Sequence, residues 1–445
     1  MTVDLSAYFD RFVKAISLDK AHLARMDRAA GALRDFIVKE YGVPSADVFL
    51  QGSYPNHTVI EPVEGGEYDI DLAAVCVDGN VTCDTALDDL ECRFSANGNY
   101  AGRIVRMAPC VRLEYSEDDV GKFHVDVVPL RRSQEPGVLQ APRRSSHWKE
   151  TAPQEYTDWC RDRGEFFTRT VKILKRWRDE QQNVHHAIKS VVLQVLIADA
   201  MPQEEDDGAR VAATLRNLHD RLIPLGAPPN VPNPVLPFEN LASRWSVQQF
   251  QDFVAELGAA VELVRTAEAA IGLADAADAW RELLGPDFPT PTPDELGLAL
   301  GPTDHEKKPS SRGWTEALNS DYSISLTAER STRRSGRSMM RLRSGDPTPV
   351  GKDLHFRANV IAPASAEVCW QVVNTGNDAR ADDGLRGEIF DGRDKLGNHL
   401  RGRTENWEST KYVGVHEIRA LLVQGNRVVA KTDYFKVPIF KGRQR

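Results

Sequence analysis

Residues 51–75, QGSYPNHTVIEPVEGGEYDIDLAAV, contain the strongest indication of the fold class of this chain. This stretch starts at the end of a short apolar run, Val48-Phe49-Leu50, which is typical of a strand and stops at Gly52-Ser53. A loop punctuated by proline and glycine follows, and the run from Tyr68 to Val77 then predicts a buried strand. Farther along, Phe123 to Val128 predicts a third strand.

A helix is predicted in front of these strands. From Leu18 to Tyr41 the apolar residues recur at helical spacing, and Gly42 with Pro44 stops the run. The order is therefore helix, strand, Gly-Ser turn, strand and later strand.

Acidic residues in two of the predicted strands point to metal chemistry. Asp69 and Asp71 stand at i and i+2, so on a strand they share one face. Asp126 could bring a third carboxylate to that face if its strand is a neighbour. Carboxylates that leave room for substrate phosphates suit Mg²⁺, and two such ions can activate a hydroxyl and stabilise leaving pyrophosphate. The alternative is a solvated strand end, but an unpaired charge inside an apolar strand is costly unless something binds it.

The Gly52-Ser53 pair is the second element of the candidate site. A glycine after a strand permits close backbone approach, and a serine hydroxyl with adjacent amides can hold phosphate oxygens. Alone, such a pair is only a turn. Its significance comes from its position ahead of the two acids.

Together these residues resemble a known family. The stretch 51–75, with FHVDVVP at 123–129, is similar to nucleotidyltransferases of the polymerase β superfamily. Within that superfamily, TVKILKRWR at 170–178, AIKSVVLQVL at 187–196 and AWRELLGPDFP at 279–289 resemble the bacterial CD-NTases, relatives of cGAS and of the oligoadenylate synthases.

The resemblance implies roles for individual residues. Asp69 and Asp71 match the two metal-binding acids, and Asp126 matches a third that also helps to deprotonate the incoming hydroxyl. It implies Mg²⁺ as the cofactor, with Mn²⁺ as a substitute. The nucleotide-binding residues that it implies are Gln51, Gly52, Ser53, Lys172, Lys175, Lys189 and Ser190. For the lysines, a solvated helix face is the alternative.

The composition predicts an ordinary globular protein of the cytoplasm. Hydrophobic residues make up 41% and charged residues 27% of 445 positions. No stretch approaches the roughly 20 apolar residues of a membrane span, and the N-terminus lacks the pattern of a signal peptide. The six cysteines are scattered without zinc spacing. A net charge of -9 argues against a general nucleic-acid coat and leaves extended nucleic-acid binding open.

The expected class is α+β: a polymerase β-like core with a helical lobe, followed by a C-terminal β-sandwich. We place the core at 1–165, the helical lobe that completes the catalytic cleft at 166–288, a linker with a basic segment at 289–350 and the sandwich at 351–445. The proline-rich texture around 286–320 favours the linker.

The predicted sandwich is similar to the AGS-C sensor domain that is fused to such enzymes. The resemblance rests on CWQVVNTG at 369–376, LRGEIF at 385–390, RTENWESTKYVGVHEIRA at 403–420 and VVAKTDYFKVPI at 428–439. It implies an activating ligand or protein as a partner, and a docking module is the alternative.

A basic run precedes this domain. Between Glu329 and residue 344 the chain carries Arg330, Arg333, Arg334, Arg337, Arg341 and Arg343. Such a run indicates either a patch that meets triphosphate or polynucleotide, or a flexible basic linker.

The resemblance implies a nucleotidyltransferase that joins nucleoside triphosphates, ATP or GTP or both, into a cyclic or short linear oligonucleotide with release of pyrophosphate, in antiphage signalling. Two alternatives stay open at this point. One is transfer of a single nucleotide to a protein, a tRNA or a small molecule. The other is an inactive nucleotide-binding sensor, which the presence of all three acids disfavours.

Overall fold

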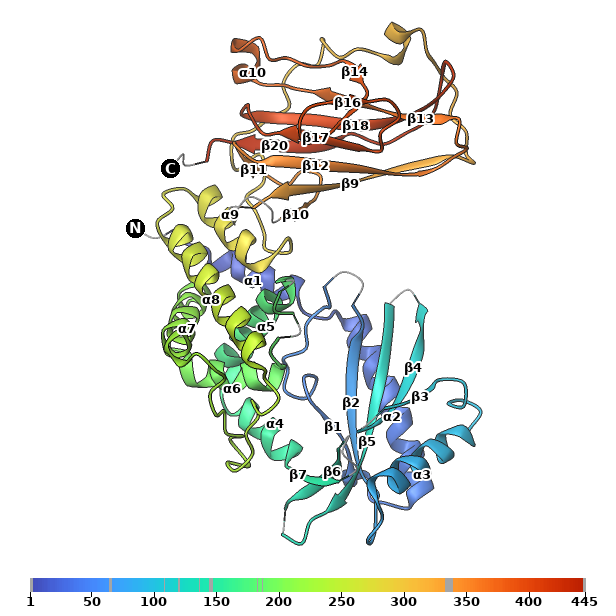
Figure 1. Cartoon of the computed structure of the whole chain (residues 1–445), viewed down its shortest axis with the longest axis vertical. Coiled ribbons are helices and arrows are strands. Elements are labelled where there is room, and N and C mark those ends of the chain that lie inside the picture. The colour runs from blue at the N-terminus through green and yellow to red at the C-terminus, as the bar shows by residue number, and fades with distance from the viewer. Residues whose placement is uncertain are drawn as a thin grey trace. The chain divides into compact units, whose positions relative to one another are not determined.

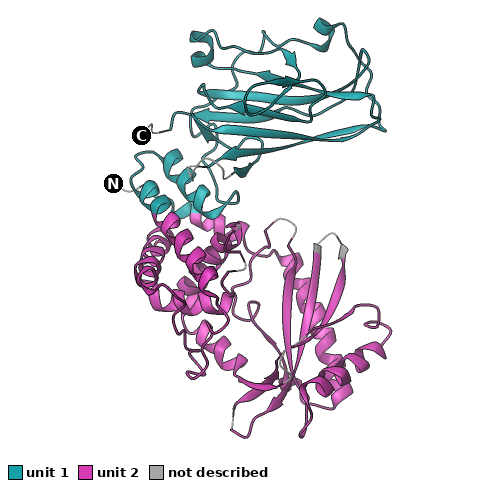
Figure 2. Ribbon diagram, viewed as in Figure 1, with its two compact units in different colours: residues 1–8, 262–445 teal, residues 9–261 magenta. Residues whose placement is uncertain are grey.

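The chain folds into two compact units (Figure 2). One unit comprises residues 9–261, and the other comprises residues 1–8 with 262–445. The structure, a computed structural model, describes residues 3–63, 66–107, 109–118, 121–135, 137–143, 147–181, 183–185, 187–332 and 339–442.

The first unit combines a mixed sheet with a group of helices (Figure 1). The elements up to residue 151 are α1 (Ser6–Ala15), α2 (Lys20–Tyr41), β1 (Val48–Gln51), β2 (Tyr68–Val75), α3 (Cys83–Ser95), β3 (Ile104–Arg106), β4 (Val111–Asp118), β5 (Gly121–Arg132), β6 (Leu139–Pro142) and β7 (Trp148–Thr151). The following helices are α4 (Pro153–Arg161), α5 (Gly164–Glu180), α6 (Ser190–Ala200), α7 (Asp207–Leu222) and α8 (Val247–Glu268). Within the described residues, none of the helices is both long and hydrophobic enough to cross a bilayer.

The sheet of this unit has the strand order β1-β2-β5-β4-β3, and β2 runs parallel to β5. Helices α2 and α3 cover one of its faces, where Ile70, Leu72 and Val125 belong to the buried core. Helix α2 begins and ends as the sequence predicts: the Asp19 side chain accepts hydrogen bonds from the first turn, and Gly42 adopts a left-handed conformation with φ of 66°. On the other face, Ala73, Val75 and Val128 belong to a second buried cluster, whereas Asp69 and Asp71 stand at the opposite end of β2.

The second unit is strand-rich. Its elements are α9 (Leu273–Leu284), β8 (Thr315–Glu316), β9 (Ser323–Ser331), β10 (Met339–Leu342), β11 (Thr348–Pro349), β12 (Asp353–Ile361), β13 (Ala366–Val373), α10 (Asn377–Ala381), β14 (Ile389–Phe390), β15 (Gly392–Arg393), β16 (His399–Leu400), β17 (Glu405–Ser409), β18 (Gly414–Gln424), β19 (Arg427–Lys431) and β20 (Phe435–Phe440). A sheet ordered β10-β9-β12-β17 and a sheet ordered β11-β20-β18-β13-β14 enclose a core that contains Phe356, Trp370 and Ile418. The α+β class with a C-terminal β-sandwich is therefore confirmed.

The segment 289–350, expected as a linker, contributes strands β8 to β11 to these sheets. Strand β9 pairs with β12 from Ser323 to Arg330, and Ala328 is buried in the sandwich core. The physical reason is the alternation of Ile324, Leu326 and Ala328 with polar residues, which gives β9 one apolar face. The domain bounds themselves stay a prediction.

The basic run is divided between a buried residue and surface residues. Arg330 is fully buried, and its guanidinium lies 2.5 Å from Asp278 and 3.5 Å from Glu282 on α9. Lys352 donates to the same Glu282 carboxylate at 2.9 Å. Arg343 pairs with an aspartate at 287, whereas residues 333, 334 and 337 lie outside the described part of the chain. Arg330 therefore belongs neither to an exposed basic patch nor to a flexible linker, because it is buried beside the carboxylates of Asp278 and Glu282.

We expect Arg330→Met to lower the free energy of unfolding by about 3–5 kcal/mol, since it leaves the buried carboxylates of Asp278 and Glu282 without this counter-ion. Urea unfolding of the full chain, followed by tryptophan fluorescence, measures the loss. Arg427→Met changes an exposed arginine on β19 and serves as the matched control. Equal stability of the two variants would contradict the stabilising role of this ion-pair network.

Candidate active site

Strand β2 directs two carboxylates away from the core. Tyr68, Ile70 and Leu72 are buried under the helices, whereas Asp69 is exposed and Asp71 is half-buried on the opposite face. This is the alternation that a half-buried strand requires. The two acids therefore face the same side of the sheet.

Strand β5 brings the third acid beside them. In the parallel pairing of β2 and β5, Asp71 lies opposite Asp126. On the other side of β5, Arg112 of β4 is the register partner of Asp126. Its Nε and Nη2 donate to the two carboxylate oxygens at 2.8 and 2.9 Å, a two-pronged ion pair that fixes the orientation of the Asp126 side chain.

The three acids place strong negative potential at Asp71. Burial, together with the charges of Asp69 and Asp126, raises the pKa of Asp71 to about 8, and Arg112 acts in the opposite direction. Two carboxylates this close disfavour each other's ionisation unless a cation neutralises them. The arrangement therefore favours a bound cation.

The turn after β1 requires glycine at position 52. Gly52 follows β1, whose last residue Gln51 lies opposite Asp71 in the antiparallel pairing with β2. Its φ of 79° is left-handed, and a Cβ atom built on it would lie 2.5 Å from Oδ2 of Asp71. Only glycine lets the turn approach the carboxylate this closely.

The loop after Gly52 is held from both sides. The Thr58 amide donates to the Ser53 carbonyl at 2.9 Å, which closes the turn. Lys175 of α5 donates from Nζ to the Thr58 carbonyl at 2.9 Å, and Gln194 of α6 donates to the Thr58 hydroxyl at 3.3 Å. Burial lowers the pKa of Lys175 to about 8, and the nearby Arg178 acts in the same direction.

A cavity of about 960 Å³ lies beside Ser53, Asp69 and Lys175. Of the other predicted site residues, Gln51, Gly52, Asp71 and Asp126 are not among those that line it. Its lining includes five of the predicted site residues, which come from the turn, β2, α5 and the start of α6: Ser53, Asp69, Lys175, Lys189 and Ser190. The volume lies within the usual range for small-molecule sites. Lys172, predicted to meet phosphates as well, lines a different cavity, where its Nζ donates to Ser17 at 3.1 Å.

The cavity also contains residues that the sequence reasoning missed. Arg178 donates to the Ser190 hydroxyl at 3.0 Å and to the Ile188 carbonyl at 3.2 Å, so it ties α5 to the start of α6. Glu67 lies next to Asp69 and pairs with Lys122 at 2.6 Å. Arg178 closes the basic motif TVKILKRWR, so its spacing of three from Lys175 was the available signal.

The fit to a divalent metal is partial as the side chains stand. Within the described residues, no group of three His, Cys, Asp or Glu side chains has the arrangement of a metal site. Asp69 and Asp71 provide hard oxygen donors on one face, which is the donor type that Mg²⁺ prefers. Arg112 occupies both oxygens of Asp126, although each carboxylate oxygen keeps a second lone pair. The donor type of Asp69 and Asp71 therefore fits a divalent ion, whereas the third carboxylate, that of Asp126, is engaged by Arg112.

Comparison with known proteins agrees with this geometry. Residues 1–164 match the Second Messenger Oligonucleotide or Dinucleotide Synthetase (SMODS) domain, and residues 303–440 match the Adenylyl/Guanylyl and SMODS C-terminal sensor (AGS_C) domain. A c-di-GMP synthase of Roseivirga ehrenbergii is 23% identical over 273 residues, which cover 53% of this chain and 71% of the relative. A cyclic AMP-AMP-AMP synthase of Acinetobacter sp. is 24% identical over 275 residues, which cover 59% and 78%.

A solved structure shows the same fold. The Bradyrhizobium diazoefficiens CD-NTase CdnG in complex with GTP superimposes with a TM-score of 0.52 at 18% identity, covering 63% of this chain and 95% of that one. The resemblance found in the sequence motifs is thereby confirmed. The chain therefore carries a SMODS domain at residues 1–164 and an AGS_C sensor domain at residues 303–440, and the part that superimposes has the fold of a CD-NTase.

Proposed function

We propose that this chain joins nucleoside triphosphates, ATP or GTP or both, into a cyclic or short linear oligonucleotide second messenger and that the cavity over β2 is its active site. The observation that carries the proposal is the register of Asp71 and Asp126, with Gly52 packed against the first of them. The relatives named as cyclic nucleotide synthases support the product class. A role in antiphage signalling rests on the family resemblance.

CD-NTases use divalent metal ions, and we propose Mg²⁺ here, with Mn²⁺ as a substitute. Asp69, Asp71 and Asp126 would hold the ions. Bound there, they would neutralise charge on the triphosphate and on the leaving pyrophosphate. The raised pKa of Asp71 supports this assignment, because a cation relieves the repulsion among the three carboxylates.

In the proposed reaction, a ribose hydroxyl oxygen of one nucleotide attacks the α-phosphorus of another. A new phosphorus–oxygen bond forms, the bond to the bridging oxygen of the β-phosphate breaks, and pyrophosphate leaves. Asp126 receives the hydroxyl proton, with its orientation fixed by Arg112. The residues that line the site contribute further to the rate by holding the attacking hydroxyl in line with the leaving pyrophosphate.

The donor triphosphate is proposed to lie along the turn and the basic helix ends. Ser53 lines the cavity, and its hydroxyl with the adjacent backbone amides would hold phosphate oxygens. Lys175 from α5 and Lys189 with Ser190 from α6 reach the same space. Their charges would offset the phosphate charge that the acids repel.

Synthesis without an added acceptor is the test of this function. Purified full chain is incubated with labelled ATP, GTP, CTP and UTP under Mg²⁺ or Mn²⁺, and products are treated with phosphatase and identified by mass spectrometry. A phosphatase-resistant oligonucleotide is the expected result. Label that appears only on an added protein, tRNA or small molecule would instead establish single-nucleotide transfer and overturn the proposal.

Asp126→Asn is expected to slow bond formation by at least about 100-fold while the affinity for triphosphate changes less than about threefold. The reason is that the amide cannot accept the hydroxyl proton, whereas the donor contacts of Ser53 and Lys175 remain. Single-turnover rates and titrations of triphosphate separate the two quantities. Asp35→Asn, on the exposed face of α2, is the matched control. If affinity fell as steeply as turnover, Asp126 would be a binding ligand and not the base.

A further inference from the structure

A separate cavity, which we call the sandwich cavity, opens into the β-sandwich of the second unit. Its volume is about 320 Å³, at the lower end of the range for small-molecule sites. The residues that line it fall between Leu354 and Ile439, so they all belong to the unit that contains the AGS_C match. The proposed synthesis uses none of these side chains.

The floor of the sandwich cavity is the end of the hydrophobic core between the two sheets. Leu354 and Phe356 come from β12 in one sheet, and the floor residues from β13, β18 and β20 in the other sheet are Val372, Ile418, Val437 and Ile439. All of them are buried members of the sandwich core. Apolar atoms that face a gap lose van der Waals contacts, and protein interiors are normally packed without such gaps. The floor therefore favours an apolar ligand body that enters between the sheets.

The loop between α10 and β14 forms one side of the mouth. The Asn374 side chain donates to the Gly384 carbonyl at 2.9 Å, and the Asn374 amide donates to the Arg386 carbonyl at 3.0 Å. A Cβ atom on Gly384 would collide with the ring of Tyr412, which also lines the cavity. Nε2 of the buried His416 donates to the Tyr412 carbonyl at 2.8 Å. These contacts hold the residues of the mouth in place.

Three arginine or lysine side chains line the sandwich cavity, and two of them are paired with acids. Arg386 donates to both carboxylate oxygens of Glu408, at 2.7 and 3.4 Å. Lys411 is exposed and forms an ion pair with Asp382 at 3.1 Å. The third cation, Arg393, differs from these two.

Arg393 is half-buried, and its guanidinium lies 4.9 Å from the centre of the Phe390 ring. Its Nε donates to Nε2 of His399 at 3.1 Å, and Nδ1 of that ring donates to the Asp391 carbonyl at 2.9 Å. Among the described residues, neither Nη group of Arg393 has a hydrogen-bond partner, and no carboxylate lies within ion-pair distance. The two Nη groups form a fork that matches the two oxygens of a carboxylate. A carboxylate on a ligand would therefore complete this site.

The acids that line the cavity favour a ligand with a single negative charge. Asp383 and Glu417 line it together with Glu408, which is paired with Arg386. A second charge on the ligand would be repelled by these carboxylates, because the lining cations other than Arg393 are already paired. A carboxylate carries one charge, whereas a phosphate monoester carries about −1.5 to −2 at neutral pH.

We infer that the sandwich cavity binds a small amphipathic monocarboxylate, whose apolar chain enters between the sheets and whose carboxylate pairs with Arg393. Such binding involves the sandwich alone and is independent of the proposed synthesis in the other unit.

Calorimetric titration of the full chain with octanoate tests this site, with octanamide as the uncharged comparison and octyl phosphate as the more highly charged one. We expect one octanoate per chain, bound at least about tenfold more tightly than either comparison, because the paired carboxylate contributes a charge-assisted hydrogen-bonded contact. Butanoate should bind at least about tenfold more weakly than octanoate, because each buried methylene group adds to the affinity.

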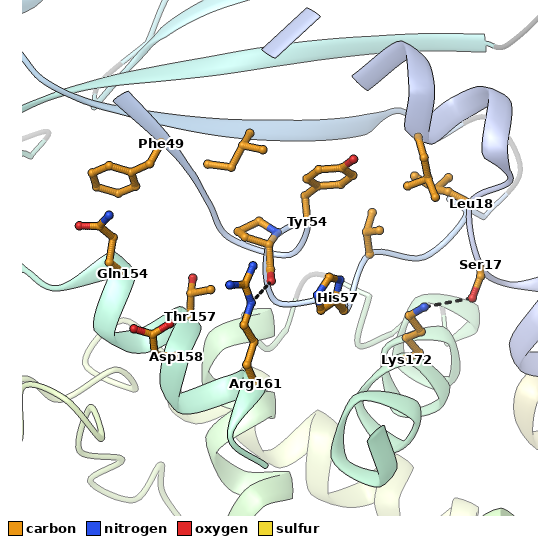
Figure 3. Close-up of a pocket in the computed structure, with 14 residues that line it drawn as sticks. Ser17, Leu18, Phe49, Tyr54, His57, Gln154, Thr157, Asp158, Arg161 and Lys172 are labelled. Atoms are coloured by element: carbon orange, nitrogen blue, oxygen red, sulfur yellow. Dashed lines mark hydrogen bonds between the residues drawn. The ribbon is translucent and has the colours of Figure 1, made fainter. Parts of the chain in front are cut away.

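Variants assign the binding to this cavity. Arg393→Gln should weaken octanoate at least about fivefold and leave octanamide unchanged, because only the carboxylate loses a contact. Two control variants should bind octanoate as the parent chain does: Arg401→Gln, which changes an exposed arginine outside the cavity, and Lys172→Met, whose side chain lines another cavity (Figure 3). A thermal melt checks that each variant is folded.

Three results would overturn the site: absence of saturable octanoate binding, equal affinity for octanoate and octanamide, or a folded Arg393→Gln variant that binds octanoate as tightly as the parent chain. Tighter binding of octyl phosphate would overturn the monocarboxylate class. Weaker binding in Lys172→Met, with no change in Arg393→Gln, would place the ligand in the other cavity and overturn the assignment to the sandwich.

Discussion

The double variant Asp69→Ala/Asp71→Ala is expected to lose oligonucleotide synthesis by more than about 10³-fold while it stays folded. Both side chains lie on the face of β2 opposite the buried core, so their truncation removes no core contact. Burial, together with the charges of Asp69 and Asp126, raises the pKa of Asp71 to about 8, so removal of both side chains also relieves unfavourable charge. Thermal stability should therefore be equal to that of the parent chain or higher.

The measurement is product formation under Mg²⁺ and under Mn²⁺, with circular dichroism and a thermal melt as the check of folding. Asp35→Ala removes an exposed carboxylate from α2 in the same unit and serves as the control. A folded double variant that retains turnover with either metal would show that these acids do not form the catalytic centre.

Gly52→Ala is expected to lower turnover by more than about 100-fold. The new Cβ atom would lie 2.5 Å from Oδ2 of Asp71, so either the carboxylate or the turn has to move. A shift of about 1 Å in a positioned group costs about 100-fold in rate. The left-handed φ of 79° adds about 1–2 kcal/mol of backbone strain for any residue with a side chain.

Gly79→Ala separates these two effects. Gly79 has a similar φ of 72°, but its Cβ would meet nothing within 4 Å, so this control carries the strain without the collision. Turnover and triphosphate affinity of both variants are compared after a thermal melt. Equal turnover of the two variants would refute the importance of the close approach between Gly52 and Asp71.

Local patterns were enough to predict the frame of the catalytic unit. The helical spacing before Gly42 predicts α2, and the apolar alternation around Asp69 and Asp71 predicts both β2 and the shared face of its acids. These signals involve neighbouring residues along the chain. The sequence also contains the glycine at the turn, although its contact with the Asp71 carboxylate emerges only from the pairing of β1 with β2.

Features that depend on distant residues could not be predicted in this way. The ion pair between Arg112 and Asp126 follows from the register of β4 and β5, which no local pattern specifies. Lys172 and Lys175 lie three residues apart on α5, and this spacing suits phosphate binding as well as a solvated helix face. The two side chains nevertheless line different cavities, because the loop after Ser53 passes between them. Their assignment to nucleotide binding stays a prediction.

The burial of Arg330 has a consequence for exchanging parts between related enzymes. Its partners Asp278 and Glu282 lie on α9, which precedes in the sequence the strands that these ion pairs stabilise. A chimera whose junction falls between α9 and β9 would combine an acidic helix from one parent with a strand surface from another. Recombination should therefore keep α9 with the sandwich, so a junction ahead of Leu273 is the sound choice for grafting this sensor domain onto another synthase.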